Sequence, residues 1–485
     1  MRKVFAIHPV LFSIWPVLLL FVDNIVDIPT DQMIFPVSAV TLLVVGLWLC
    51  LSYIIKDVKV AAIILSPWMV AFLVYGRVYE YAKHCMRGTK WHLIIIGCLS
   101  ILGLTILLLY SYKVIKLRCR GKIVNSITNK MNLLAIVLIG INLIQIGIYL
   151  FSKESRNNLT PEFNFNSSPP KGASSHPDIY YILLDEYASL DQLRAKFNYD
   201  GSEFTRRLER RGFYIATKSR SRYIDTHRSL SAVLNMENPK QTENASDSMT
   251  IVFASWLNME QLEDAYFKRL IRQNRVMRIL KSLGYKYIHF GSWYYATRYN
   301  IFAEENFNYE GFRLRNELNM LVVQSSIIRM VFSNGNLQRG GILYAFDQIA
   351  SVAKIKGPKF LFAHIICPHN PFVFGANGEK VPFKDRDNIN NRSIYLGQYI
   401  FVTKKVERLI DEILCNSNNP PIIIIQSDHG YRLDKEFANQ IFNAYYLPGI
   451  GKELLSECSS PVNTFRIIFN KYFDGRYELI GNSCY

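Results

Sequence analysis

Residues 420–430 read PPIIIIQSDHG, and the apolar run Pro421–Gln426 within them contains four consecutive isoleucines. A short, wholly apolar run bounded by turn-forming residues is typical of a strand that is buried on both faces of a parallel sheet. Similar runs occur at Ile179–Leu184, Tyr285–Phe290 and Phe360–Ile366. The second half of the chain is therefore predicted to contain at least these four buried strands.

Amphipathic stretches separate these strands. The clearest is Leu396–Leu414, where apolar residues recur at helical spacing with lysine, glutamate and arginine between them. Strands that alternate with helices indicate an α/β domain with a mostly parallel sheet sandwiched by helices. In such domains the functional side chains gather at the carboxyl ends of the strands.

Polar residues follow three of the predicted strands. Asp185 follows the strand Ile179–Leu184. His369 follows the strand Phe360–Ile366, which also contains His364. Asp428 and His429 follow the strand Pro421–Gln426. An aspartate after a strand often caps a helix, and Asp-His-Gly is a common turn, so neither is specific alone. Together, carboxylates and imidazoles at one edge of a sheet suit a divalent cation such as zinc or manganese.

The first 152 residues have a different composition, because they contain most of the long apolar runs. Runs of this length indicate helices that cross a membrane, where backbone groups must be bonded within the segment. We expect about five such helices in a transmembrane domain of residues 1–152, a polar linker at 153–176, and a catalytic domain at 177–485. The five runs are Pro9–Val22, Ile34–Ile55, Val60–Tyr75, Trp91–Tyr112 and Leu133–Phe151.

Basic residues suggest how the helices are oriented. The N-terminus and the loop before the fifth run are basic, whereas Asp23–Gln32 is acidic, and lysine and arginine tend to stay on the cytoplasmic side. The basic loop Arg77–Lys90 argues the other way. We expect a multi-pass protein of the inner or plasma membrane with its C-terminal domain extracytoplasmic.

The net charge of +17 fits a protein beside anionic lipid headgroups. No zinc finger or RNA-binding aromatic signature is present, so we expect no nucleic-acid partner. The eight cysteines include no C-x-x-C pair. Two alternatives remain open for the C-terminal domain, either a Cys458–Cys484 disulfide or four free thiols.

Five ordered motifs resemble those of the sulfatase-like membrane enzymes of the alkaline phosphatase superfamily, a group that includes lipoteichoic acid synthases and phosphoethanolamine transferases. The resemblance covers about residues 177–450. The motifs are Ile179-Tyr-Tyr-Ile-Leu-Leu-Asp185, Thr226-His-Arg-Ser-Leu230, His364-x4-His369-Asn-Pro371, Ser427-Asp-His-Gly430 and Asn443-Ala-Tyr-Tyr-Leu-Pro448.

The resemblance implies that Asp185, Thr226, Asp428 and His429 bind a divalent metal, with Thr226 also acting as the nucleophile. A threonine hydroxyl is a weak nucleophile until a cation lowers its pKa, so the two roles belong together. Ser229 is the rival nucleophile. The metal is expected to be manganese, zinc or magnesium at one site.

The family pattern gives His369 and His364 a catalytic role, either binding the transferred group or protonating the leaving oxygen. The same two histidines are candidates for a second, weaker metal site. Glu186 is interpreted as a helix-start residue, with a second metal ligand as the alternative. Four further residues are candidates for contact with the substrate, with an ordinary surface or core role as the alternative: His227, Arg228, Arg432 and Trp293.

These features predict a membrane-anchored transferase that moves a phosphoglycerol or phosphoethanolamine headgroup from a lipid donor to a glycan or lipid acceptor of the cell envelope, through a phospho-threonine. One alternative is a hydrolase of phosphate or sulfate esters, and another is a non-catalytic ligand-binding membrane protein. The Cys-x-Pro-x-Arg element of classical sulfatases, the source of formylglycine, does not occur. The sequence leaves the oligomeric state open.

Overall fold

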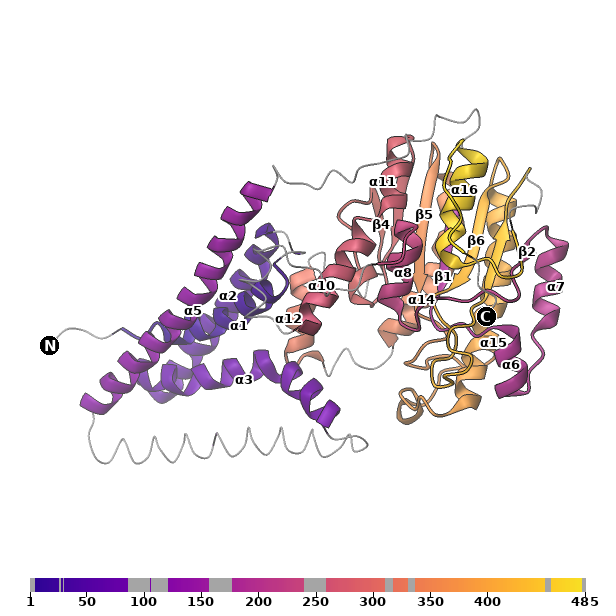
Figure 1. Ribbon diagram of the computed structural model, residues 1–485. Helices are drawn as coiled ribbons and strands as arrows, with labels where there is room; N and C mark the ends of the chain where they lie inside the picture. Colours follow the sequence, from indigo (N-terminus) through magenta and orange to yellow (C-terminus); the bar gives the residue numbers. More distant parts are fainter. Residues whose placement is uncertain are drawn as a thin grey trace. The chain divides into compact units, whose positions relative to one another are not determined.

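The computed structural model describes residues 5–25, 28, 30–85, 105, 121–156, 177–239, 259–309, 317–329, 336–449 and 455–481 (Figure 1). The chain divides into two compact units. The helical unit comprises Met1–Pro161 and Leu314–Ser333, and the sheet unit comprises Glu162–Arg313 and Asn334–Tyr485. The segment Leu314–Ser333 thus belongs to the helical unit although its neighbours on both sides in sequence belong to the sheet unit, which the predicted boundaries did not anticipate.

The helical unit contains the apolar helices of the N-terminal region. Within the part of the chain that the structure describes, three segments are long and apolar enough to cross a membrane: Thr30–Ile55, Val58–Val78 and Lys122–Leu150. Four of the five predicted runs are helical, and Trp91–Tyr112 falls almost entirely outside the described residues, so the number of spans stays a prediction. The elements are α1 (His8–Asp23), η1 (Thr30–Met33), α2 (Ile34–Ile55), α3 (Val58–Cys85), α5 (Lys122–Arg156) and α12 (Glu317–Ser325).

Polar contacts hold the start of α1 against its neighbours. The Asn132 side chain on α5 accepts hydrogen bonds from the backbone N–H groups of Ile7 and His8 at 3.1 and 3.0 Å. His8 Nδ1 lies 2.6 Å from Ser66 Oγ on α3. The two bonds to Asn132 satisfy backbone N–H groups that the first turn of a helix leaves without partners.

An ion pair joins the far ends of α1 and α3. Arg77 Nη2 contacts the Asp23 carboxylate. The positive charge of Arg77, which argued against an extracytoplasmic position for its loop, is therefore offset by a negative charge at the same end of the unit.

The sheet unit is built on a seven-stranded sheet with the order β2-β7-β6-β1-β5-β3-β4. The strands β6, β1, β5, β3 and β4 run parallel, while β7 pairs antiparallel with both β6 and β2. The predicted mostly parallel sheet is confirmed. The bounds are β1 (Ile179–Leu184), β2 (Tyr214–Ile215), β3 (Lys286–Phe290), β4 (Glu305–Phe307), β5 (Lys359–Ile365), β6 (Ile422–Ser427) and β7 (Asn443–Tyr446).

Both faces of the sheet are covered by helices, as alternate residues of β1 demonstrate. Tyr180 and Ile182 pack into one apolar cluster, and Tyr181 and Leu183 pack into another. Full burial of each such side chain stabilises the fold by roughly 1.5–3 kcal/mol. The first cluster is covered by α6 (Leu190–Phe197), α7 (Ser202–Arg210), α14 (Asn336–Ile349) and α15 (Arg392–Asn416), and the second by α8 (Thr226–Asn235), α10 (Met259–Arg272), α11 (Arg275–Ser282) and α16 (Thr464–Tyr472).

The register of the central strands sets the position of the polar residues. Leu184 at the end of β1 lies opposite Ile365 on β5 and Ser427 on β6. The residues that come next, Asp185 and Asp428, therefore leave the sheet side by side at the same edge. The connecting 3-10 helices are η3 (Tyr295–Thr297), η5 (Ala350–Lys354), η6 (Phe383–Asp385) and η8 (Pro461–Asn463).

The cysteines of the sheet unit are not all free. Cys458 is disulfide-bonded, whereas Cys367 and Cys415 are free. The alternative of four free thiols is therefore wrong, and Cys484, the predicted partner of Cys458, lies outside the described residues. A disulfide in this unit fits an oxidising compartment.

Candidate metal centre

Three buried acceptor atoms face one another at the carboxyl ends of β1 and β6. They are Asp185 Oδ1, Asp428 Oδ2 and His429 Nε2, and the ligand atoms of these residues lie within 4.8 Å of one another. None of the three atoms has a hydrogen-bond partner among the described residues. Buried polar atoms normally find a partner, so three such atoms together indicate a ligand that the chain itself does not supply.

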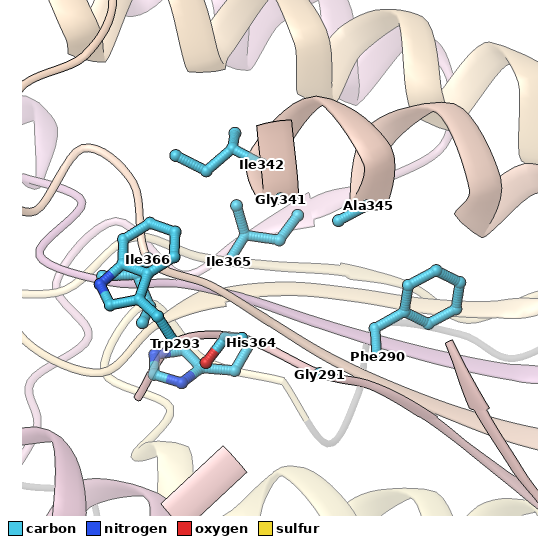
Figure 2. Close-up of a pocket in the computed structure, with 10 residues that line it drawn as sticks. Phe290, Gly291, Trp293, Gly341, Ile342, Ala345, His364, Ile365 and Ile366 are labelled. Atoms are coloured by element: carbon cyan, nitrogen blue, oxygen red, sulfur yellow. The ribbon is translucent and has the colours of Figure 1, made fainter. Parts of the chain in front are cut away.

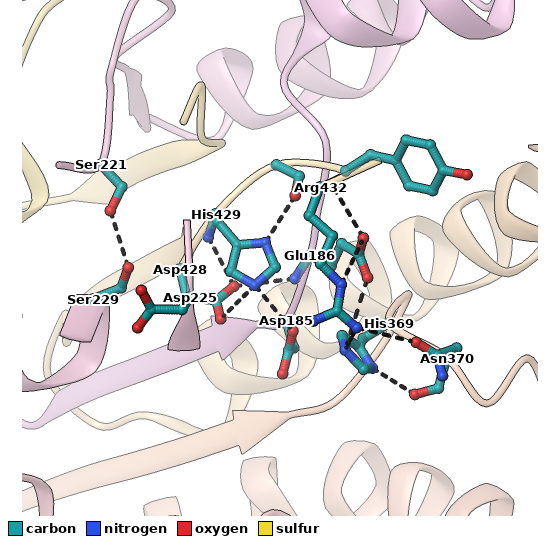
Figure 3. Close-up of polar contacts among 12 residues, drawn as sticks. Asp185, Glu186, Ser221, Asp225, Ser229, His369, Asn370, Asp428, His429 and Arg432 are labelled. Carbon is teal, nitrogen blue, oxygen red and sulfur yellow. Dashed lines mark hydrogen bonds and ion pairs between the residues drawn. The ribbon is translucent and has the colours of Figure 1, made fainter. Parts of the chain in front are cut away.

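The remaining polar atoms of these side chains are held in place (Figure 3). Asp428 Oδ1 accepts hydrogen bonds from the backbone N–H groups of Glu186 and His429, at 3.0 and 2.8 Å. His429 Nδ1 lies 2.8 Å from the carbonyl oxygen of Gly430, to which it can only donate. The tautomer that carries its proton on Nδ1 therefore presents the lone pair of Nε2 to the two carboxylates.

The charges at this point favour a cation. Burial alone would raise the pKa of Asp185, but His369, His364 and His429 outweigh it, and the net pKa of Asp185 is lowered. Burial likewise lowers the pKa of His429, but Asp428 and Asp185 outweigh it and the net pKa is raised. Two carboxylate oxygens and one imidazole nitrogen are the donor set that zinc and manganese take, so these residues fit a divalent metal.

His364 lies behind Asp185. It is within β5, is 2% exposed, and its Nε2 lies 3.2 Å from Asp185 Oδ2. Its Nδ1 lies 2.8 Å from Thr297 Oγ1, which also contacts Ser292 Oγ at 2.9 Å. Both ring nitrogens are thus engaged, and the contacts suit a residue that orients Asp185.

Glu186 is placed differently from the sequence interpretation. Helix α6 begins at Leu190 with Ser189 as its cap, so the interpretation of Glu186 as a helix-start residue is wrong. Glu186 has a φ of 61°, a left-handed conformation that costs roughly 1 kcal/mol or more in a non-glycine residue. Its carboxylate is turned toward His369 and Arg432, at 3.9 Å from each, and accepts a hydrogen bond from the Arg432 N–H at 3.0 Å.

His369 and Arg432 lie in contact with each other near the three acceptor atoms. His369 Nδ1 contacts the carbonyl oxygen of Asn370, to which it can only donate, and its Nε2 accepts a hydrogen bond from Arg432 Nη2 at 2.8 Å. Arg432 Nη2 also donates to Asn370 Oδ1 at 3.4 Å. The Arg432 side chain is 45% exposed, so it lies within reach of an anion from solvent.

Thr226 opens helix α8 and is half-buried. Its neighbour Asp225 caps the helix by accepting a hydrogen bond from the Arg228 N–H at 3.0 Å. A helix N-terminus directs backbone N–H groups at an anion. The rival Ser229 is 3% exposed, with Oγ 3.1 Å from Ser221 Oγ and 3.3 Å from the Tyr223 carbonyl oxygen, so its hydroxyl is shielded.

His227 and Arg228 both contact Asp225. His227 Nε2 and Arg228 Nη1 each lie 3.3 Å from its carboxylate. Phe267 on α10 packs against both, with its ring 4.8 Å from the His227 ring and 5.8 Å from the Arg228 guanidinium carbon. Two basic side chains are thus held at the N-terminus of α8, and their contact with substrate stays a prediction.

Trp293 lines a small pocket next to His364 (Figure 2). The other walls are mainly apolar and include Phe290, Ile342 and Ile366. The indole also packs against the apolar cluster of one sheet face. Both the substrate and the packing interpretations of Trp293 fit this position.

Comparison with solved structures finds similar folds at low identity. The C-terminal periplasmic domain of EcEptC from Escherichia coli matches with a TM-score of 0.40 and 11% identity, over 64% of this chain and 87% of that chain. The soluble domain of lipooligosaccharide phosphoethanolamine transferase A from Neisseria meningitidis matches with a TM-score of 0.39 and 15% identity, over 63% of this chain and 90% of that chain. The lipoteichoic acid synthase LtaP from Listeria monocytogenes matches with a TM-score of 0.39 and 12% identity, over 66% of this chain and 77% of that chain.

No curated protein matches the chain. The model of the family described as Sulfatase matches residues 177–465, which is more than half of the chain. This match confirms the predicted resemblance at the level of the family, and it supports an enzyme that acts on phosphate or sulfate esters. The chain belongs to the Sulfatase family.

Proposed function

We propose that this protein is a metal-dependent, membrane-anchored transferase that moves a phosphoglycerol- or phosphoethanolamine-type headgroup from a lipid to a glycan or lipid of the cell envelope. The observation that carries the proposal is the group of three buried acceptor atoms without partners at Asp185, Asp428 and His429. Apolar helices in the same chain support a donor that is itself a lipid.

Asp185, Asp428 and His429 would hold the divalent metal, zinc, manganese or magnesium, with the hydroxyl of Thr226 as a fourth ligand. When bound, the ion lowers the pKa of a ligated hydroxyl and neutralises charge on phosphoryl oxygens. His364 keeps Asp185 in place through its 3.2 Å contact.

Thr226 acts as the nucleophile. Its Oγ1 forms a bond to the phosphorus of the donor, the bond between phosphorus and the lipid oxygen breaks, and the headgroup becomes a phospho-threonine ester. The proton of the Thr226 hydroxyl passes to solvent. His369 Nε2, which accepts a hydrogen bond from Arg432 in the resting state, takes up a proton from solvent when Arg432 moves and passes it to the leaving oxygen. A hydroxyl of the acceptor then attacks the phosphorus and gives its proton to His369 Nε2, while the bond between phosphorus and Thr226 Oγ1 breaks and Oγ1 takes a proton from solvent.

Arg432, His227 and Arg228 supply positive charge around the transferred group. Arginine pairs with phosphoryl oxygens through parallel hydrogen bonds. For Arg432 this requires a shift from His369 toward the donor, which releases His369 Nε2 for proton transfer.

Intact-mass analysis of the full-length protein tests the nucleophile. After incubation with a phospholipid donor and without acceptor, the wild-type protein and Ser229→Ala should both gain the mass of one headgroup phosphate. Peptide mapping should place it on Thr226, and Thr226→Ala should gain nothing. An adduct on Ser229, or full transfer by Thr226→Ala, would contradict the proposal.

The family assignment keeps a second function open, the hydrolysis of a phosphate or sulfate ester by the same side chains. Product release distinguishes the two. A transferase releases the donor's alcohol in multiple turnovers only when the acceptor is present, whereas a hydrolase turns over with water alone.

A further inference from the structure

The segment Leu314–Ser333 leaves the sheet unit, packs as part of the helical unit and returns. The chain therefore passes between the two units three times, at residues 161–162, 313–314 and 333–334. A protein whose catalytic domain simply follows its membrane anchor would need one passage. The additional excursion calls for a reason, and α12 (Glu317–Ser325) suggests one.

The apolar side of α12 is buried among the helices of the helical unit. Leu318 is 0% exposed and belongs to the same apolar cluster as Phe21 of α1 and Leu73 of α3. Leu321 and Val322 pack against this cluster, which also includes Val40 of α2. The burial of these side chains gives α12 a defined seat on three helices.

Gly76 on α3 sets how closely the segment approaches. A Cβ atom at Gly76 would lie 2.0 Å from the Gln324 carbonyl oxygen and 2.8 Å from the Ser325 Cα. Any larger residue would have to displace the backbone of α12. Small residues at a contact between membrane helices allow this kind of close backbone approach.

Two hydrogen bonds fix the chain that follows α12. The Ile327 N–H donates to the Phe72 carbonyl oxygen at 3.0 Å, and Arg329 Nη1 donates to the Gly76 carbonyl oxygen at 3.1 Å. Both acceptors lie on α3, close to Arg77 and its ion pair with Asp23. Apolar burial, close backbone contact and hydrogen bonds thus occur together at one end of the helical unit.

We propose that residues 317–329 form a second, non-covalent attachment, in which α12 docks on α1, α2 and α3 and keeps the sheet unit joined to the helical unit independently of residues 153–176. The partner of this surface is therefore a segment of the same chain, inserted between two parts of the sheet unit. The attachment does not depend on the proposed chemistry, because it involves none of the residues of the metal centre.

Cleavage of the full-length protein tests the attachment. A specific protease site is introduced between Asn166 and Ser167, and the solubilised protein is immobilised through an N-terminal tag, cut and washed. The wild-type C-terminal fragment should stay on the resin. In Gly76→Leu the retained fraction should fall by at least about tenfold.

Gly46→Leu is the matched control, because Gly46 lies on α2 with no atom within 4 Å of a Cβ built there. It should retain the fragment as the wild type does. Release of the wild-type fragment on cutting, or equal retention in Gly76→Leu, would overturn the proposal.

A second pair of variants tests the other side of the contact and decides the matter if Gly76→Leu does not fold. Leu318→Lys places a charge in the buried seat and should release the fragment, whereas Gln324→Lys, at an exposed position of the same helix, should not. Retention in Leu318→Lys would show that another contact holds the units together. Activity is not measured in any arm, so failure here leaves the proposed transferase untouched.

Discussion

At the residue scale, the two oxygens of the Asp185 carboxylate have different surroundings. Oδ2 is held by His364, whereas Oδ1 faces Asp428 and His429 without a partner. Thr297 maintains this difference from one residue further away, because its hydroxyl contacts His364 Nδ1. The orientation of the Asp185 carboxylate thus depends on Thr297, which contacts His364 and not Asp185 itself.

Replacing Thr297 with valine should weaken metal binding by about tenfold to a hundredfold, as loss of an outer hydrogen bond to a metal-ligating group commonly does. Valine keeps the shape of the side chain but leaves His364 Nδ1 without its partner. Calorimetric titration of the chelator-treated protein with zinc measures the change.

Thr297→Ser restores the hydroxyl and should restore the zinc affinity. If Thr297→Val binds zinc as tightly as the wild type, His364 does not position Asp185.

His289 predicts a dependence of stability on pH. Burial lowers its pKa to about 4 from the ordinary 6.5, and its Nε2 lies 2.9 Å from the Thr297 carbonyl oxygen. Between about pH 6.5 and pH 4, His289 therefore binds a proton in the unfolded chain but not in the folded chain. The folded state should lose about 1.4 kcal/mol per pH unit over that window, a total of about 3 kcal/mol.

Thermal unfolding of the wild type and His289→Gln between pH 7 and pH 5 isolates this contribution, because glutamine does not titrate. The unfolding midpoint of His289→Gln should fall less steeply with decreasing pH. Parallel pH profiles would show that His289 is protonated equally in both states.

The sequence could predict a site residue where strand register alone positions it, and not where a backbone turn or a contact with a distant residue does. Asp185 and Asp428 were predicted because each follows a strand with at least four consecutive apolar residues, and the strand register brings them together. Glu186 and Thr297 were not, since their roles depend on a left-handed backbone turn and on a contact across 67 residues. No local pattern marks either one.

At the element scale, helix α8 begins at Thr226, the candidate nucleophile, and Asp225 caps its first turn. This residue caps the helix and also contacts His227 and Arg228. Capping residues of this kind accept from backbone N–H groups that have no other partner.

Asp225→Ala should destabilise the sheet unit by about 1 kcal/mol through the lost cap. Asp225→Asn retains an oxygen acceptor for the cap and should therefore lose only a few tenths of that amount, while it removes the negative charge beside His227 and Arg228. The melting midpoint of the full-length protein, followed by circular dichroism, should fall by about 2–4 °C in the alanine variant. Equal midpoints for the two variants would mean that the cap contributes little.

Element length explains which helices the sequence revealed. Helix α15 was expected because 25 residues give many repeats of the helical period. Helix α12 has nine residues, which is too few to span a membrane. Its seat on α1, α2 and α3 depends on Gly76, more than 200 residues earlier, and distant complementarity of this kind leaves no trace in either segment alone.

At the scale of the whole molecule, metal occupancy should be visible in stability. A ligand that binds only the folded state stabilises it by about 2.7 kcal/mol at a concentration one hundred times its Kd. Chelation should therefore lower the unfolding midpoint of the wild type, and zinc or manganese should restore it.

Asp428→Asn provides the control, because it removes one charged ligand and retains the size of the side chain. Its midpoint should not respond to chelator or metal. A response equal to that of the wild type would place the stabilising ion elsewhere.

The sheet ends in unusually brief strands on both sides. β2 has two residues, Tyr214–Ile215, and β4 has three, Glu305–Phe307. An outermost strand with many unpaired backbone groups is a template on which another polypeptide can add and begin a fibril. The edge strands β2 and β4 each offer too few consecutive unpaired backbone groups for this. The native domain should therefore resist growing into cross-β aggregates even when many copies crowd together on one membrane.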